Sequence, residues 1–330
     1  MAPVGFPEVQ GWTGDDHCAA LECYLQSAAL NGFPVPAEDT LPGLLREPDS
    51  ARAFFEDNFT AFRVLAAPGL LTAYFEPVLK GSRTPPGFPV PVYRRPDELK
   101  PLPPGHPLTE LGLTAGREFS GGFESYHTRA EIEAGALAGR SLELLYLADP
   151  VEAFVMHVQG SGLAELTDGR RVRLSFDGKN GYPYSSISKL LVERGDLKLE
   201  DAHLDGLRAW LRAQSEPQAV LNWNKSYIFF KELERSAAAP KASCGVELRT
   251  GRSLAADPLY HATGTPIWVE ASELAFEARP FQRLLVAQDT GSAIVGPQRG
   301  DVFAGMGPEA GSIAGRVRHR CAFIVLRPRR

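Results

Sequence analysis

The segment Val286-Ala287-Gln288-Asp289-Thr290-Gly291-Ser292-Ala293-Ile294-Val295-Gly296-Pro297-Gln298-Arg299-Gly300-Asp301-Val302-Phe303 carries most of the information about the fold. An apolar run ends at Asp289, a glycine-rich turn follows, and Asp301 enters a second apolar run. Short apolar runs bounded by glycine are typical of β-strands. The segment therefore predicts two aspartates at the ends of neighbouring β-elements, where glycines let backbone or a ligand approach closely.

The whole chain has the composition of a globular protein with many short strands. Its 330 residues suggest two domains, and 44% hydrophobic with 23% charged residues argues against wholesale disorder. The 32 glycines and 27 prolines favour strands and turns over long helices. A net charge of −5 argues against a nucleic-acid partner, which would need a basic surface. The sequence has no apolar run of about 18 residues, so we expect no membrane span.

The first residues, Met1 to Phe6, lack the basic and apolar regions of a signal peptide. This leaves a cytosolic protein, or an exported one whose signal segment lies outside this sequence. The four cysteines, at positions 18, 23, 244 and 321, show no CxxC spacing, and we interpret them as small buried thiols. Whether Cys244 and Cys321 pair stays open. The sequence shows no metal-ligand spacing, so we expect neither metal nor cofactor.

Hydrophobic periodicity and capping residues predict a mixture of helices with many strands, an α+β architecture with barrel-like β domains. One helix follows Asp15-Asp16, and a second follows Asp49-Ser50 with Phe55, Phe59 and Phe62 on one face. A buried strand is predicted over 151–158. Further helices are predicted from Thr128 to about 139, over 185–194 and over 200–213; strands over 70–79, 90–94, 163–166 and 172–176, the last two as a hairpin; and an extended loop over 96–107.

Two short matches to catalytic motifs are outweighed by simpler interpretations. Asp289-Thr290-Gly291-Ser292 resembles the aspartic-protease triplet, but that chemistry needs two carboxylates sharing a proton, and the sequence has no second triplet. Ser186-Ile187-Ser188-Lys189 matches Ser-x-x-Lys of penicillin-binding proteins, but their partner motifs are absent from the sequence. We interpret it as the capped start of a helix.

Two polar turns follow predicted strands and have two interpretations. They are Val158-Gln159-Gly160-Ser161-Gly162 and Gly178-Lys179-Asn180-Gly181-Tyr182. Amides hydrogen-bond sugar hydroxyls and N-acetyl groups, and tyrosine offers an apolar face to a sugar ring, so both turns suit a carbohydrate site. Ordinary loop chemistry explains them equally well. Of the three aspartates that border C-terminal strands, namely Asp257, Asp289 and Asp301, one or two are expected to cap turns.

Taken in order, the motifs of this chain resemble those of the membrane-bound lytic murein transglycosylases of type A, the MltA family with its C-terminal three-aspartate domain. The resemblance covers nearly the whole chain. Its motifs are Gly11-Trp12, Leu71-Thr72-Ala73-Tyr74-Phe75-Glu76-Pro77, Pro91-Val92-Tyr93-Arg94, Thr128 to Leu137, Val158 to Gly162, Gly178 to Gly181, Arg252 to Asp257, and Asp289 through Gly296 to Asp301.

The resemblance implies a fold and an activity. A double-psi β-barrel domain would comprise residues 1–80 and 235–330, and a smaller β domain, residues 81–234, would be inserted in it. A groove between them would hold a peptidoglycan strand. The family cleaves the β-1,4 bond between N-acetylmuramic acid and N-acetylglucosamine without water, forming a 1,6-anhydro ring. The sugar's own 6-hydroxyl attacks C1, so one carboxylic acid can serve as acid and then base.

The resemblance also implies residue roles. Asp301 matches the catalytic acid, which must stay partly protonated near neutral pH and hence needs an apolar setting. Asp289 would support it, and Asp257 would be structural. Residues expected to contact the glycan are Glu76, near the domain junction, and Gln159, Ser161, Lys179, Asn180 and Tyr182 from the inserted domain.

The sequence departs from the family at two positions of its C-terminal domain. Ser292 stands where many relatives carry glycine, and Val295 where they often carry lysine. The substrate implies a periplasmic location, with outer-membrane association only through a lipid anchor that this sequence lacks, and we expect a monomer. Two alternatives remain: a non-catalytic peptidoglycan-binding module, or a hydrolytic muramidase of the same fold.

Overall fold

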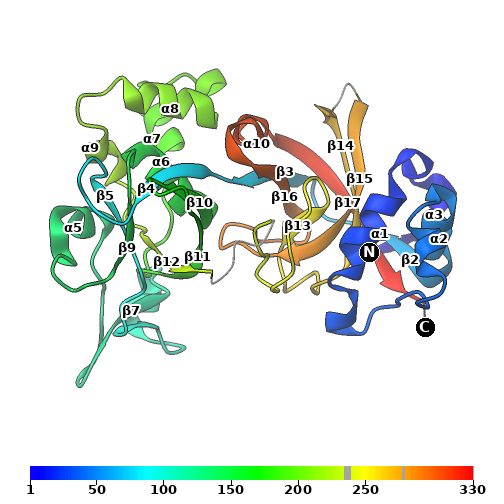
Figure 1. Ribbon diagram of the computed structural model, residues 1–330. Helices are drawn as coiled ribbons and strands as arrows, with labels where there is room; N and C mark the ends of the chain where they lie inside the picture. The colour runs from blue at the N-terminus through cyan, green and yellow to red at the C-terminus, as the bar shows by residue number, and fades with distance from the viewer. Residues whose placement is uncertain (234–238, 277–278, 330) are drawn as a thin grey trace. The chain divides into compact units, whose positions relative to one another are not determined.

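The chain folds into two compact units in a computed structural model that describes residues 1–233, 239–276 and 279–329 (Figure 1). Unit 1 comprises Met1–Phe75, Ala237–Gly305 and Glu309–Arg330, and unit 2 comprises Glu76–Ser236 and Met306–Pro308. The N-terminal and C-terminal parts of the sequence thus build unit 1 together.

Unit 1 is built on a sheet that closes on itself. Its strand order is β1-β2-β17-β14-β15-β13-β16-β3, and β17 also pairs with β3, so six of the strands form a closed ring. This confirms the predicted barrel-like β domain. The ring strands are β3 (Gly69–Glu76), β13 (Ser253–Ala256), β14 (Pro266–Phe276), β15 (Arg279–Asp289), β16 (Arg299–Met306) and β17 (Arg318–Pro328); β1 (Ala2–Val4) and β2 (Phe59–Arg63) extend the sheet beyond β17.

An apolar cluster fills the inside of this ring. Leu71 of β3, Leu254 of β13, Val302 of β16 and Phe323 of β17 all belong to it and are almost fully buried. Successive side chains of a strand point to opposite faces. The residues next to these four along each strand therefore point to the outer face of the ring, and Asp301 is one of them.

Helices cover one side of the barrel. Helix α1 (His17–Leu25) begins where predicted, since Asp16 accepts a hydrogen bond from Ala19 N at 3.0 Å. Helices α2 (Leu41–Leu44) and α3 (Pro48–Asn58) follow, and Tyr24 and Phe55 pack with Trp268 of β14 in a second apolar cluster. Helix α10 (Gly307–Ala314) lies between β16 and β17 in the sequence.

The second predicted helix was placed wrongly at both ends. It begins at Pro48, after Glu47, and it ends at Asn58. Phe59 and Phe62, which the i, i+4, i+7 spacing had assigned to one helical face with Phe55, belong instead to β2. The reason is tertiary: β2 pairs with β1 on one side and β17 on the other, so the sheet overrides the helical spacing.

Unit 2 contains a six-stranded and a three-stranded sheet. The larger has the order β12-β11-β10-β4-β9-β5 and the smaller β6-β7-β8. The antiparallel β10–β11 pairing confirms the predicted hairpin. The strands are β4 (Val78–Ser82), β5 (Val90–Tyr93), β6 (Leu99–Pro101), β7 (Ala115–Phe119), β8 (Gly122–Glu124), β9 (Glu143–Leu147), β10 (Ser161–Leu166), β11 (Arg171–Lys179) and β12 (Ile228–Glu232). Strand β6 lies within the proline-rich segment that was predicted to be a loop.

The predicted strand over 151–158 is wrong, because these residues form helix α6 (Pro150–Gln159). Asp149 caps its N-terminus, and Gly160, with φ of 79°, ends it. The segment is mostly apolar because α6 is buried on two sides. Ala153 belongs to an apolar cluster with the strands of the larger sheet, and Phe154 to one with the following helices. The period of the hydrophobic pattern does not by itself distinguish a fully buried helix from a buried strand.

Two of the remaining helices of unit 2 begin at predicted caps, whereas the helix predicted over 200–213 begins only at Leu204, after His203. Thr128 forms a capping box with Glu131 at α5 (Arg129–Glu131), and a π-turn follows over Ile132–Ala136. Ser186 caps α7 (Ile187–Glu193), which confirms the simpler interpretation of the Ser-x-x-Lys match. The other helices are α4 (Pro107–Glu110), α8 (Leu204–Arg212) and α9 (Pro217–Leu221).

The surface and the cysteines have ordinary features. All four cysteines are free thiols; Cys23 and Cys321 are buried, as predicted, whereas Cys18 and Cys244 are only partly buried.

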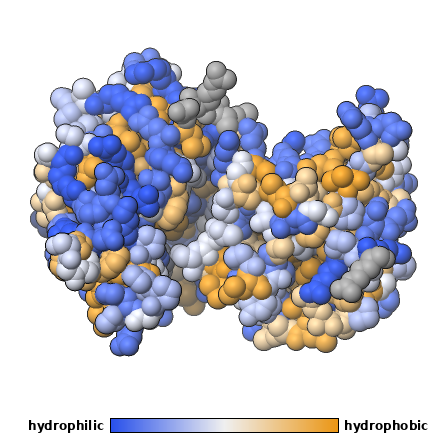
Figure 2. Space-filling view, turned by 90° about the horizontal axis from the view of Figure 1, so that it is seen from below, coloured by the Kyte–Doolittle hydropathy of each residue, from blue (hydrophilic) through white to orange (hydrophobic). Residues whose placement is uncertain are grey.

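On the face drawn in Figure 2, hydrophilic residues surround several separate hydrophobic areas. Among the described residues, no helix is both long enough and apolar enough to cross a bilayer.

Candidate active site

Two of the three predicted aspartates lie in one row across the barrel sheet of unit 1. Ala255 of β13 pairs with Asp301 of β16 on one side and with Asp289 of β15 on the other. Paired residues of neighbouring strands project from the same face, and strands lie about 4.8 Å apart. The two aspartates are therefore about 10 Å apart along the sheet, separated only by the small side chain of Ala255.

A β-bulge brings Asp289 into this row. Ala287 pairs with the residue before Ala255, yet Asp289 rather than Gln288 pairs with Ala255 itself, so Gln288 is the extra residue. Its side chain is buried, donating to Cys23 O at 2.7 Å and accepting from Ser253 Oγ at 2.7 Å. An extra residue in a strand shifts by one position the alternation of side chains between the inner and the outer face. Asp289 consequently joins Asp301 on the outer face.

The carboxyl group of Asp301 is set in an environment that favours its neutral form. It is partly buried, between Gly300 and the buried Val302 and Phe303. Its pKa is raised from 3.8 to about 6; desolvation is the largest cause, and the nearby charge of Asp289 adds to it. A hydrogen bond from Thr72 and the charge of Arg299 act in the opposite direction.

Thr72 and Arg299 form a hydrogen-bonded chain that ends on this carboxyl group. Arg299 Nη2 donates to Thr72 Oγ1 at 2.8 Å, and Thr72 Oγ1 donates to Asp301 Oδ1. Arg299 is itself fixed by donating to the backbone oxygens of Leu70, at 3.3 Å, and Gly300. Burial lowers the pKa of the Arg299 guanidinium.

Asp289 has a different environment, because hydrogen-bond donors surround its carboxylate. Its Oδ1 accepts from the backbone N–H groups of Ser243 and Thr290, each at 2.9 Å. Its Oδ2 accepts from the hydroxyl of Tyr74 at 2.8 Å. Tyr74 also packs against Phe303, with ring centroids 5.4 Å apart, so it covers part of the site.

Asp257, the first of the three aspartates, holds a turn. It is 4% exposed, its Oδ1 accepts from Leu259 N at 3.0 Å, and its Oδ2 accepts from Gly296 N at 2.7 Å. Through Gly296, it anchors the loop that joins β15 to β16. Asp257 therefore holds the loop between β15 and β16 in place, but it does not belong to the row that contains Asp289 and Asp301.

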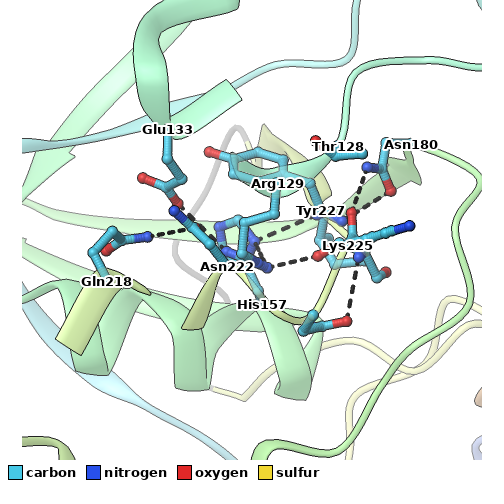
Figure 3. Close-up of polar contacts among 12 residues, drawn as sticks. Thr128, Arg129, Glu133, His157, Asn180, Gln218, Asn222, Lys225 and Tyr227 are labelled. Carbon is cyan, nitrogen blue, oxygen red and sulfur yellow. Dashed lines mark hydrogen bonds and ion pairs between the residues drawn. The ribbon is translucent and has the colours of Figure 1, made fainter. Parts of the chain in front are cut away.

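Asn180, one of the polar residues predicted in unit 2, is fully buried and bridges two loops (Figure 3). Its Nδ2 donates to the backbone oxygens of His127 and Lys225, each at 2.8 Å, and its Oδ1 accepts from Tyr227 N at 2.9 Å. Every polar group of this side chain is thereby occupied. The neighbouring Arg129 is also buried, contacting Glu133, His157 and Ser226 O.

Glu76 is likewise inaccessible, at 0% exposure. Its two carboxylate oxygens accept from Arg173 Nε at 3.0 and 3.2 Å, and Arg173 also contacts Met306 Sδ. Desolvation raises the pKa of Glu76, and Arg173 opposes that effect. The other four predicted residues are partly exposed: Gln159 at the end of α6, Ser161 on β10, Lys179 on β11, and Tyr182, whose hydroxyl donates to Tyr126 O at 3.2 Å.

Prediction from sequence gave no role to Thr72, Tyr74, Arg299 or Ser243. A signal existed for two of them, since Thr72 and Tyr74 are polar residues at alternate positions of a mostly apolar strand and so share one face. No such signal marked Arg299 or Ser243 in the sequence. Among the described residues, no group of three or more histidine, cysteine and acidic side chains is arranged to hold a metal ion.

Comparison with known proteins places these features in a family. Residues 70–231 match the model of the MltA-specific insert domain, and residues 252–327 match the model of the 3D domain. Membrane-bound lytic murein transglycosylase A of Escherichia coli K12 is 35% identical over 256 residues. That alignment covers 75% of this chain but only 62% of the relative, so the chain spans less than two thirds of the curated protein.

Solved structures resemble the chain over nearly its full length. A membrane-bound lytic murein transglycosylase from Agrobacterium tumefaciens matches with a TM-score of 0.85 and 35% identity, covering 99% of this chain and 97% of that one. E. coli MltA with bound chitohexaose matches with a TM-score of 0.75 and 27% identity, covering 100% and 94%. On the strength of this full-length similarity, together with the insert and 3D domains, the chain belongs to the MltA family of lytic murein transglycosylases.

Proposed function

We propose that this protein is a lytic transglycosylase that cleaves the β-1,4 bond between N-acetylmuramic acid and N-acetylglucosamine in peptidoglycan, with Asp301 as the general acid and base. The observation that carries the proposal is the carboxyl group of Asp301, whose pKa of about 6 keeps part of it protonated near neutral pH. A general acid works best when its pKa is close to the working pH. The membership of the family supports the substrate class.

The reaction needs only this one titrating group. Protonated Asp301 would donate to the glycosidic oxygen as the bond to C1 breaks. The resulting carboxylate would take the proton of the sugar's 6-hydroxyl as that oxygen bonds to C1, closing the 1,6-anhydro ring. Because the 6-hydroxyl and C1 belong to the same sugar, proximity replaces an external nucleophile. The proton returns to Asp301, and the catalyst is regenerated.

The environment of Asp289 favours this chemistry over hydrolysis. A hydrolytic glycosidase uses a second carboxylate to activate water or to attack C1. The charge of Asp289 acts on Asp301, but its oxygens already accept from Tyr74 and two backbone N–H groups. We therefore assign Asp289 a supporting role, in which it keeps Asp301 protonated to higher pH and holds the loop that follows β15.

The contacts with the glycan fall to the partly exposed residues of unit 2. We propose that Gln159, Ser161, Lys179 and Tyr182 bind sugar hydroxyls and N-acetyl groups. The buried side chains of Glu76 and Asn180 instead stabilise unit 2 through their hydrogen bonds. The complex of E. coli MltA with chitohexaose supports a chain of N-acetylated sugars as the ligand. The substrate and the membrane-bound relatives support an envelope location.

The test is digestion of isolated murein, followed by mass spectrometry of the soluble products. We expect muropeptides with 1,6-anhydro ends from the natural protein and at least 100-fold fewer from Asp301→Asn, since general acid catalysis contributes about 10²- to 10⁴-fold. Asp39→Asn, at an exposed position, is the matched control. Reducing ends would show hydrolysis instead, and murein binding without product would show a binding module. Near-normal activity of Asp301→Asn would refute the assignment of the acid.

A further inference from the structure

The two oxygens of the Asp301 carboxyl group have unequal surroundings. Oδ1 accepts the hydrogen bond from Thr72. Oδ2 accepts no hydrogen bond from any described residue, and it is not among the buried polar atoms that lack partners. Oδ1 is therefore held by Thr72, whereas Oδ2 has no hydrogen-bond partner among the described residues.

The direction of the Thr72 hydrogen bond is set by Arg299. A hydroxyl has one proton to donate and lone pairs that accept, whereas a guanidinium only donates and stays protonated. Arg299 Nη2 therefore occupies a lone pair of Thr72 Oγ1. Within the described residues, Asp301 Oδ1 is the sole acceptor for the hydroxyl proton of Thr72. If Oδ1 carried the carboxyl proton, that hydroxyl proton would lose its acceptor.

We propose that Thr72, oriented by Arg299, is a positioning residue that keeps the transferable proton of Asp301 on Oδ2, the oxygen without a hydrogen-bond partner among the described residues. This inference rests on the proposed function, in which Asp301 is the acid. It adds that Thr72 makes the two oxygens unequal: Oδ1 is a permanent acceptor, and Oδ2 alone donates to the glycosidic oxygen and receives the proton from the 6-hydroxyl.

The chain offers a matched set of variants for this idea. Thr72→Val removes the hydroxyl at nearly constant shape, and Thr72→Ser keeps it. Thr60→Val makes the same isosteric change on β2, as a control. Should the valine variant fail to fold, Thr72→Ala provides the same loss with less bulk.

The first measurement is the pH dependence of murein cleavage. Without the hydroxyl, the proton distributes over both oxygens, which halves the fraction that Oδ2 carries, so kcat in Thr72→Val should fall at least about twofold while KM stays nearly unchanged. The descending alkaline limb of kcat/KM should move to higher pH by about one unit, because the hydrogen bond from Thr72 that lowers the pKa of Asp301 is lost. Thr72→Ser should retain the natural profile, as should Thr60→Val. A valine variant with unchanged kcat and alkaline limb, or a serine variant as impaired as valine, would overturn the proposal.

The second measurement is independent of activity. Infrared difference spectra between the natural protein and Asp301→Asn, recorded below pH 5, isolate the C=O stretch of protonated Asp301. That stretch should move to higher frequency in Thr72→Val, since the carbonyl at Oδ1 loses its donor. An unmoved stretch would mean that Oδ1 carries the proton and would refute the assignment. Full activity in Asp301→Asn would refute the proposed function alone, leaving the infrared result to decide the hydrogen bond.

Discussion

Replacing Asp301 by asparagine should stabilise the protein above pH 6 while abolishing its activity. The fold disfavours the charged form of this side chain, as its raised pKa shows. Asparagine has a similar shape, is neutral at every pH and keeps an oxygen that can accept from Thr72. The substitution therefore removes the unfavourable burial of a charge and leaves the hydrogen bond in place.

The magnitude follows from the shift of the pKa from 3.8 to about 6. One pKa unit corresponds to about 1.4 kcal/mol, so ionised Asp301 destabilises the folded state by about 3 kcal/mol. A raised pKa means that the folded state binds more protons than the unfolded state between pH 4 and 6. The contribution of Asp301 to stability is therefore complete below pH 3.8 and disappears as the pH rises through 6. The stability difference between variant and natural protein should grow from near zero at pH 4 to about 3 kcal/mol at pH 8.

The assay is urea unfolding of both proteins at half-unit steps from pH 4 to 8. Intrinsic fluorescence follows the transition, because Trp12 and Trp268 are buried in the core of unit 1. Other titrating groups are common to both proteins and cancel in the difference. Asp39→Asn, an exposed carboxylate, should stay within about 0.5 kcal/mol of the natural protein at every pH. A difference for Asp301→Asn that is constant with pH, or negative at pH 8, would refute the idea that desolvation sets its pKa.

Three further outcomes follow from other contacts. In the natural protein, kcat/KM should fall about tenfold per pH unit above pH 6, as Asp301 loses its proton, and a flat profile would contradict this. Glu76→Ala should lower the free energy of unfolding by about 3 to 5 kcal/mol, because it leaves Arg173 buried without its carboxylate; calorimetry measures this, and a changed KM with unchanged stability would instead indicate a sugar contact. Gly300→Ala should destabilise by about 1 to 3 kcal/mol in urea unfolding, since the new Cβ would lie 2.9 Å from Phe323 Cζ inside the barrel; no loss would show that the barrel core yields.

Several parts of the fold could be predicted from sequence because their causes are local. The caps at Asp16, Thr128 and Ser186 were identified correctly, since a capping side chain bonds backbone groups only two or three residues away. The β10–β11 hairpin was also found, because its turn, Asp168-Gly169, lies between alternating strands. Fold class followed from the same short-range patterns.

The errors arose where burial came from distant parts of the chain. The helix α6 was taken for a strand because it is covered on two sides, which removes the amphipathic period that identifies a surface helix. Phe59 joined a strand because β17, some 260 residues later, supplies its partner. Neither neighbour is visible in a local window of sequence.

The sequence by itself predicted that two aspartates close to glycines border two strands, and it singled out Asp301 through the motifs of a family. It placed those strands side by side, whereas β13 lies between β15 and β16. Only the tertiary structure decided what each carboxyl group does. The bulge at Gln288 turns Asp289 to the same face as Asp301, and Thr72 reaches Asp301 across 229 positions of the chain. A pKa depends on every charge, donor and apolar group around it. Those surroundings come from strands far apart in the sequence, so they exist only once the barrel has closed.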